Sequence, residues 1–316
     1  MKFLRVGFLF FAALGGTIAS LAGRGDVGPE QEPRIATKSG SNRAAMRPAA
    51  VLRHDVRVVL VPVTVTDTLD RPITDLSQDR FRILEDGVEQ KISSFISEDA
   101  PVSLGLLFDS SGSMKNRIVA SVAAIKQFFQ TTIPGDEFFV IQFSDQARLL
   151  GGFTSDPEEI QRRLGFVQAG GWTALLDAVA LGSHKMKSAV NRSRVLLILS
   201  DGADNNSRFS ESEVRNLVLE SDLRIYAIGL YQRPRLLQQL AEETGGRLLL
   251  ARSLNDLPDV VQHLGAEIRS RYLLGYSSNN PMSEGKYRKV KVVLEQPHGS
   301  PPLRVSWRHG YYNSAE

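Results

Sequence analysis

The chain has 316 residues, of which 42% are hydrophobic and 23% charged, and a formal net charge of +3 at pH 7. This composition is typical of a globular protein with one large core or two modest ones, and it excludes wholesale disorder. The small net charge gives no electrostatic reason to expect a nucleic acid as partner. The sequence contains no cysteine, which excludes disulfides, thiolate metal sites and cysteine nucleophiles.

The first 22 residues have the layout of a secretory signal peptide. Lys2 and Arg5 precede the apolar run Val6–Leu14, and the small-residue pattern Ser20-Leu21-Ala22 follows. We expect cleavage after Ala22, a secreted or periplasmic location, and a net charge of 3 − 2 = +1 for the mature chain. The alternative is an uncleaved segment that anchors the chain in a membrane, although glycines interrupt the run. Residues 23–50 are small and polar without a hydrophobic period, which predicts a disordered tether.

Residues 51–99 predict three short strands. Every second residue from Val59 to Val65 is valine, which is the alternation of a strand with one buried face. Two more strands are predicted at Phe81–Glu85 and Gln90–Phe95, joined through Asp86-Gly87, a pair that favours a two-residue hairpin turn.

Residues 271–316 carry three further strand-like segments, rich in Val, Tyr and Leu. These segments are Tyr272–Tyr276, Tyr287–Leu294 and Leu303–Trp307. Three short antiparallel strands cannot bury a core alone, so the N-terminal strands need a partner sheet. We therefore expect the two ends of the chain to form one small accessory β-sandwich.

Residues 100–270 alternate nearly continuous apolar runs with amphipathic segments. The apolar runs are predicted as buried strands at Ser103–Asp109, Phe138–Ser144, Arg194–Ser200, Arg224–Leu230 and Arg247–Ala251. The predicted helices are Arg117–Gln130, Pro157–Val167, Ala174–Lys187, Ser210–Glu220 and Pro234–Thr244, with a last one striped by Leu257, Val261, Leu264 and Ile268. This regular alternation predicts an α/β fold with a doubly wound, mostly parallel sheet flanked by helices.

Oxygen-bearing side chains gather where the functional crevice of such a sheet lies, at the carboxyl ends of the strands. They are Asp109, Ser111, Ser113, Thr173 and Asp201. None offers sulfur or imidazole, so they suit a hard cation, Mg²⁺ first and Mn²⁺ or Ca²⁺ as alternatives, rather than zinc. Two carboxylates balance the charge of a divalent ion and hydroxyls add none, so an anion from outside could complete its coordination. The same residue types also cap helices and fill turns. That alternative would have to account for the polar residues of all three loops at once.

The pattern Asp-x-Ser-x-Ser at 109–113, with Thr173 after a glycine pair and Asp201-Gly202 after a buried strand, resembles the metal-ion-dependent adhesion site of von Willebrand factor A domains. The resemblance covers about residues 100–270 and implies a Rossmann-like fold. It implies that the serines and the threonine coordinate the ion directly or nearly so, and that the aspartates coordinate it directly or through water. It also implies that an acidic group of a protein ligand binds the ion at the remaining position. Trp172, between the glycine pair and Thr173, departs from the usual small residues.

The flanks resemble a narrower group. The segments Phe81–Gly87 and Tyr272–Tyr276, with Tyr287-Arg288-Lys289, are similar to the ends of the exported A-domain-related family abundant in the bacterial phylum Acidobacteria. The intact adhesion-site pattern and the export signal together predict a non-enzymatic, metal-dependent adhesion or scaffolding module. An alternative is an envelope-assembly protein in which the metal only stabilises the fold.

A serine hydrolase is the least favoured alternative. Ser111 or Ser113 would be the nucleophile, but the five histidines fall in the tether, the terminal strands or helices, away from the strand-end loops. The chain also lacks a Gly-x-Ser-x-Gly elbow and the glycine-rich loops of nucleotide-binding proteins. For Asp204 and Asn205, close behind Asp201, turn formation is favoured over support of the site.

Overall fold

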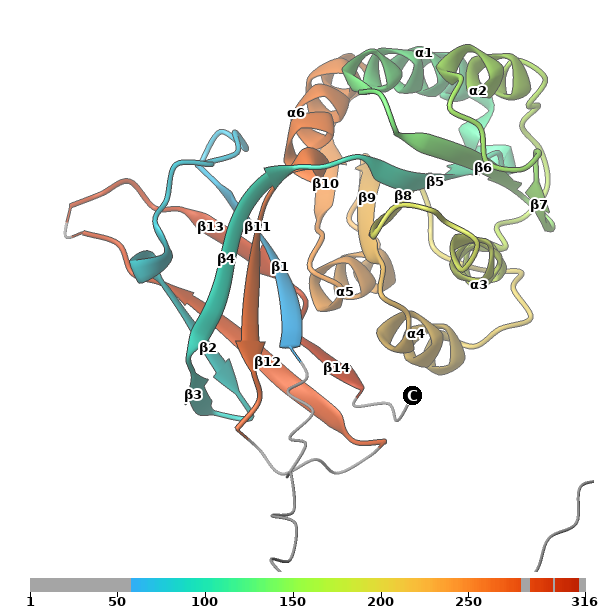
Figure 1. Cartoon of the computed structure of the whole chain (residues 1–316). Coiled ribbons are helices and arrows are strands. Elements are labelled where there is room, and N and C mark those ends of the chain that lie inside the picture. Colours follow the sequence, from blue (N-terminus) through green and yellow to red (C-terminus); the bar gives the residue numbers. More distant parts are fainter. Residues whose placement is uncertain (1–57, 280–284, 298, 313–316) are drawn as a thin grey trace, which may run out of the picture. The chain divides into compact units, whose positions relative to one another are not determined.

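The computed structural model describes residues 58–279, 285–297 and 299–312 (Figure 1). The expected signal peptide, residues 1–22, and the expected tether, residues 23–50, lie outside this part of the chain. Among the helices described, none combines the length and the apolar character needed to span a membrane.

A six-stranded sheet forms the centre of the A-type region predicted for residues 100–270. Its spatial order is β10 (Leu248–Ala251), β9 (Arg224–Leu230), β8 (Ser193–Ser200), β5 (Val102–Asp109), β6 (Glu137–Phe143) and β7 (Ala147–Leu149). Neighbouring strands are parallel except β7, which runs antiparallel to β6. The predicted mostly parallel sheet is therefore confirmed. β7 was not predicted, because it is only three residues long and largely exposed.

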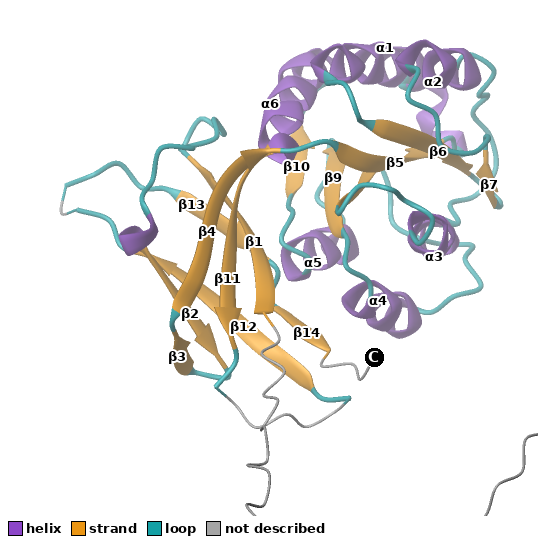
Figure 2. Cartoon of the chain, in the orientation of Figure 1, coloured by secondary structure: helices purple, strands orange, loops and turns teal. Residues whose placement is uncertain are grey.

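Six helices cover the two faces of this sheet (Figures 1 and 2). One face packs against α1 (Ile118–Phe128), α2 (Pro157–Leu164) and α6 (Leu257–Arg269). The other packs against α3 (Leu175–Met186), α4 (Glu211–Glu220) and α5 (Arg235–Glu243). All eight residues of the central strand β5 are buried, as its continuous apolar run predicts. Short 3₁₀ turns lie at Gln78–Arg80, Gly112–Asn116, Phe129–Thr131 and Leu254–Asp256.

The two ends of the described chain form two four-stranded sheets that share a hydrophobic core. One sheet has the order β13 (Arg304–Trp307), β1 (Val58–Thr66), β11 (Ser270–Ser277), β4 (Ile92–Asp99). The other has the order β14 (Gly310–Tyr312), β12 (Tyr287–Leu294), β2 (Phe81–Glu85), β3 (Val88–Gln90). Val63 of β1 lies opposite Tyr272 of β11, so the predicted sandwich of N-terminal and C-terminal strands is confirmed.

The structure confirms the predicted hairpin turn but not the single strand predicted after it. Asp86 and Gly87 both have positive φ, 48° and 87°, as the predicted two-residue turn requires. The single strand predicted at Gln90–Phe95 was wrong, because β3 ends at Gln90 and β4 begins at Ile92 in the other sheet. The alternation of buried and exposed side chains cannot reveal that the chain passes from one sheet to the other at Lys91, since the alternation continues through that residue.

A buried carboxylate ties the two sheets of the sandwich together. Glu85 is fully buried and accepts hydrogen bonds from the hydroxyls of Tyr276 at 2.6 Å, Ser278 at 2.5 Å and Tyr311 at 3.0 Å. Burial, together with the Glu85 carboxylate, raises the pKa of Tyr311 to about 12 and also raises that of Tyr276. The folded state therefore favours the protonated phenols.

Alkaline pH is expected to weaken the sandwich through these phenols. Because the pKa of Tyr311 is raised to about 12 in the folded protein, its contribution to stability is complete below about pH 10 and is lost as the pH rises towards 12. With allowance for its partial exposure we expect about 1–2 kcal/mol. Urea unfolding at about pH 8 and pH 11 should show a smaller alkaline loss for Tyr311→Phe than for the unmodified chain. An equal loss in both proteins would contradict this, and Tyr312→Phe is the control.

Candidate metal centre

Three loops meet at the carboxyl ends of the central strands. The first follows β5, the second precedes α3 and the third follows β8. The backbone joins the first two directly, because the Gly112 N–H donates to the Gly171 carbonyl at 2.9 Å and the Gly170 N–H donates to the Ser110 carbonyl at 2.8 Å. The predicted convergence of these loops is therefore present in the folded chain.

Gly171 allows the second loop to pack closely against Asp145, in the turn between β6 and β7. Its φ of +80° is a conformation that other residues rarely adopt, and a Cβ added there would lie 2.5 Å from the carboxylate of Asp145. Asp145 uses the same carboxylate to accept the N–H of Trp172 at 2.7 Å. Glycine is thus needed at this position for the loop that carries Thr173.

Four of the five predicted ligands belong to one hydrogen-bond network. The Ser111 and Ser113 hydroxyl oxygens are 3.0 Å apart, and the Ser113 hydroxyl donates to Asp201 Oδ1 at 2.7 Å. Asp109 Oδ1 accepts the Ser111 N–H at 2.8 Å, and its Oδ2 accepts the Ser200 hydroxyl at 2.5 Å. Thr173 lies on the adjacent loop, and its hydroxyl has no hydrogen bond within the described residues.

Both carboxylates of the site are withdrawn from solvent. Asp109 is fully buried and Asp201 nearly so. Burial raises the pKa of the Asp109 carboxyl, and hydrogen bonds from Ser200 and Ser111 oppose this in part. Asp201 Oδ2 accepts no well-oriented hydrogen bond and forms an ion pair with Arg117. Oδ2 therefore has lone pairs that accept no hydrogen bond, although the guanidinium of Arg117 lies against them.

The donor set fits a hard divalent cation. Within the described part of the chain, no three His, Cys, Asp or Glu side chains are grouped to hold a metal. An ion here would therefore need the hydroxyls and water in addition to the two carboxylates. Mg²⁺ accepts such neutral oxygen ligands and keeps several waters when bound, so the residues present suit it.

Asp204 and Asn205 hold the loop that carries Thr173. Asn205 Oδ1 accepts the Thr173 N–H at 2.8 Å, while the N–H groups of Asn205 and Asn206 donate to the Thr173 carbonyl at 3.0 and 3.2 Å. Asp204 Oδ1 accepts the Leu176 N–H at 3.1 Å. Asp204 also accepts the hydroxyl of Ser207, three residues further on, which is a local turn contact of the kind that the sequence favoured. Both side chains in addition hold the loop that carries Thr173 and the start of α3, because the β8 loop folds back onto them.

The sequence reasoning missed several residues around Asp201. Ser200 binds Asp109, and its place directly before Asp201 was the one available signal. The guanidinium carbon of Arg117 lies 4.7 Å from the centroid of the Tyr231 ring. The Gln232 side chain donates to the main-chain carbonyl of Asp201. No pattern in the sequence indicates these contacts, since they depend on side-chain conformations.

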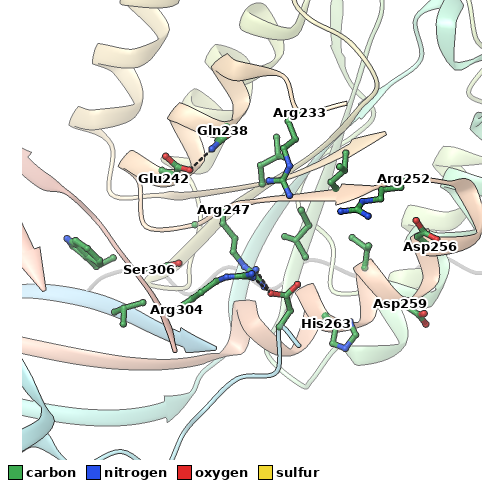
Figure 3. A pocket seen from close by; sticks show the side chains of 18 of the residues that line it. Arg233, Gln238, Glu242, Arg247, Arg252, Asp256, Asp259, His263, Arg304 and Ser306 are labelled. Atoms are coloured by element: carbon green, nitrogen blue, oxygen red, sulfur yellow. Dashed lines mark hydrogen bonds and ion pairs between the residues drawn. The ribbon is translucent and has the colours of Figure 1, made fainter. Parts of the chain in front are cut away.

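A cavity of about 800 Å³ lies away from these loops, along the edge strands β10 and β13 (Figure 3). Arg247 and Arg304 point towards each other in it, and both bind Asp70, at 2.7 and 2.6 Å. Arg247 also binds the carboxylate of Glu267. These arginines link β10 and α6 to the sandwich, so the cavity does not offer them as free ligand-binding groups.

The fold and the site together define a class. A doubly wound sheet carries Asp-x-Ser-x-Ser after its central strand, a threonine loop beside it and an aspartate after the next strand, which is the arrangement of A-type domains. A family model described as the von Willebrand factor type A domain matches residues 104–203. The chain therefore contains a von Willebrand factor type A domain.

Solved structures agree on the fold. A von Willebrand factor type A protein from Catenulispora acidiphila is 13% identical, with a TM-score of 0.51, and the match covers 83% of this chain and 74% of that one. The proximal thread matrix protein 1 of the mussel byssus is 18% identical, with a TM-score of 0.50, and the match covers 58% of this chain and 51% of that one. A search of curated proteins found no match.

Proposed function

We propose that this chain is an exported, metal-dependent protein-binding module. Asp109, Ser111, Ser113, Thr173 and Asp201 would hold a Mg²⁺, with Mn²⁺ or Ca²⁺ as alternatives, and an acidic side chain of a partner protein would bind the ion. The observation that carries the proposal is the direct network from Asp109 through Ser111 and Ser113 to Asp201. The match to the von Willebrand factor type A domain supports a protein partner.

The charges of the site favour an acidic ligand. The bound ion would supply an electrophilic centre, because the carboxylates of Asp109 and Asp201 balance its charge and the hydroxyls add none. Asp109, whose carboxylate accepts the Ser200 hydroxyl at 2.5 Å, would bind the ion from the buried side of the site. Ser113 would have to turn its hydroxyl from Asp201 towards the ion. A partner's carboxylate would then add the one negative ligand that the chain itself does not provide.

A binding role fits these residues better than hydrolysis does. Within the described residues no histidine is hydrogen-bonded to Ser111 or Ser113, whose hydroxyls contact each other and Asp201. A serine nucleophile needs a base within hydrogen-bond reach.

The export of the module is proposed from the signal-peptide layout of residues 1–22.

Calorimetric titration of residues 23–316 with Mg²⁺ or Mn²⁺, after treatment with EDTA, tests the proposal. We expect binding by the unmodified chain and at least about tenfold weaker binding by Asp109→Ala, because the buried anchor is lost. Asp259→Asn, on α6 and away from the site loops, is the matched control and should bind as the unmodified chain does. Absence of binding by the unmodified chain, or equal binding by Asp109→Ala, would refute the proposal.

The alternative role, in which the metal only stabilises the fold, is favoured by one observation. The proposed ligands come from three separate loops, so an ion there would also cross-link the structure. Partner capture from the native cell envelope, with and without chelator, separates the two roles. If capture survives EDTA while the melting temperature falls, the metal is structural and the partner binds elsewhere.

A further inference from the structure

We propose that Arg117 competes with the metal ion for Asp201, as a cation built into the chain. When no ion is bound, the guanidinium neutralises the Asp201 carboxylate, and it must move away before an ion can bind with full affinity. This inference rests on the proposed function of the site. It adds a means by which occupancy of the site is regulated.

The burial of Asp201 creates the need for such a cation. Its side chain is 1% exposed, and one of its oxygens, Oδ1, already accepts the Ser113 hydroxyl at 2.7 Å. The other oxygen, Oδ2, forms an ion pair with Arg117 and accepts no hydrogen bond. A buried carboxylate without a compensating charge is strongly destabilising. Arg117 is the one cationic side chain paired with Asp201 among the described residues, so it provides that charge.

The influence of Arg117 reaches the second carboxylate as well. Its positive charge lowers the pKa of Asp109, against the larger effect of burial. The guanidinium therefore acts electrostatically on both carboxylates that a divalent ion would use. An ion that enters while Arg117 remains in place would face a like charge at close range, which opposes its binding.

The Arg117 side chain is partly exposed and lies beside an exposed aromatic ring. It lies at the end of the 3₁₀ turn Gly112–Asn116 and directly before α1. Its side chain is 29% exposed and rests over the ring of Tyr231, which is 48% exposed. The guanidinium makes this cation–π contact while it is paired with Asp201, so it keeps one favourable contact when it leaves the carboxylate. A long flexible side chain that contacts both a buried acid and an exposed ring can therefore give up the acid and keep the ring.

The consequence is that metal binding and binding of the partner's acidic group strengthen each other. Once released from Asp201 but still against Tyr231, the guanidinium would lie on the exposed side of the site, where an acidic group of a partner would also arrive. A carboxylate that bound both the ion and Arg117 would hold the arginine away from Asp201. Ligand binding would then strengthen metal binding, and metal binding would strengthen ligand binding by the same factor.

Metal titrations of three variants test the inference. We expect Arg117→Met to bind Mn²⁺ about tenfold more tightly than the unmodified chain, since the competing charge is removed and the aliphatic stem is largely kept. Arg117→Lys should stay close to the unmodified chain, because its charge remains. Arg252→Met, on the cavity of Figure 3, removes an equal charge elsewhere and should have no effect.

Thermal unfolding provides an independent readout. In EDTA, Arg117→Met should melt below the unmodified chain, since Asp201 is left without its counter-charge, and saturating Mn²⁺ should abolish or reverse that difference. Equal or weaker Mn²⁺ binding by Arg117→Met, with Asp109→Ala still defective, would overturn the role of Arg117 and leave the metal site standing. Absence of Mn²⁺ binding by every protein, including Arg117→Met, would refute the metal site itself.

Discussion

Replacing Glu267 with glutamine is expected to lower the free energy of unfolding by about 3–5 kcal/mol. Glu267 of α6 is fully buried, and both of its oxygens accept the Arg247 Nε, at 2.9 and 2.7 Å. Burial raises the pKa of Glu267 and Arg247 opposes that effect. Glutamine would leave Arg247 buried with Asp70 as its remaining acid. An unbalanced charge in the interior costs more than the intact pair contributes.

Urea unfolding at neutral pH measures this change. Glu89→Gln is the matched control, because Glu89 forms an equally direct pair with Arg82 on the exposed face of the sandwich, and its loss should change stability little. The double variant Arg247→Met with Glu267→Met should recover most of the loss, since no unpaired charge remains. If Glu267→Gln were as stable as the unmodified chain, the ion pair between Arg247 and Glu267 would not be shielded from water.

Gly171→Ala is expected to damage the site and the fold together. The new Cβ would meet the Asp145 carboxylate at 2.5 Å in a backbone conformation with φ of +80°. Strain of this kind costs about 1–3 kcal/mol. Relief of the clash would displace the loop that carries Thr173 and break the hydrogen bond between Gly112 and Gly171. Metal affinity should therefore fall at least about tenfold.

Gly170→Ala is the neighbouring control. A Cβ there meets nothing within 4 Å and its φ is not positive, so both stability and metal binding should be preserved. Unfolding in urea and calorimetric titration with Mn²⁺ should be made on the same preparations. If the two alanine variants behaved alike, the close packing of this loop against Asp145 would not depend on glycine.

The sequence was sufficient for most of the fold because the strong hydrophobic patterns coincide with buried elements. The unbroken apolar run of β5 indicated burial on both faces, and all its residues are buried. The alternating valines of β1 face the sandwich core. β7 and β14 escaped prediction because each has only three residues, too few to establish a period.

The candidate site was predictable in its residue types and less so in its contacts. Asp109, Ser111 and Ser113 follow one strand and Asp201 follows its neighbour, so topology alone brings them together. Metal binding by these residues stays a prediction. Arg117 could not be assigned to Asp201 from its position, because a long side chain can reach many partners. Asn205 could not be assigned to Thr173, since the path of the connecting loop has no periodic signal.

The A domain leaves the sandwich and returns to it at adjacent strands, which constrains the order of folding. Asp99 at the end of β4 lies opposite Ser270 at the start of β11, so the whole A domain separates two hydrogen-bonded neighbours. In the unfolded chain, closing so long a loop is slow and entropically costly. Folding of the A domain shortens that search, so the sandwich should assemble last. Until then the strands β1 and β4 would expose unpaired edges, and slow maturation of the A domain would favour aggregation.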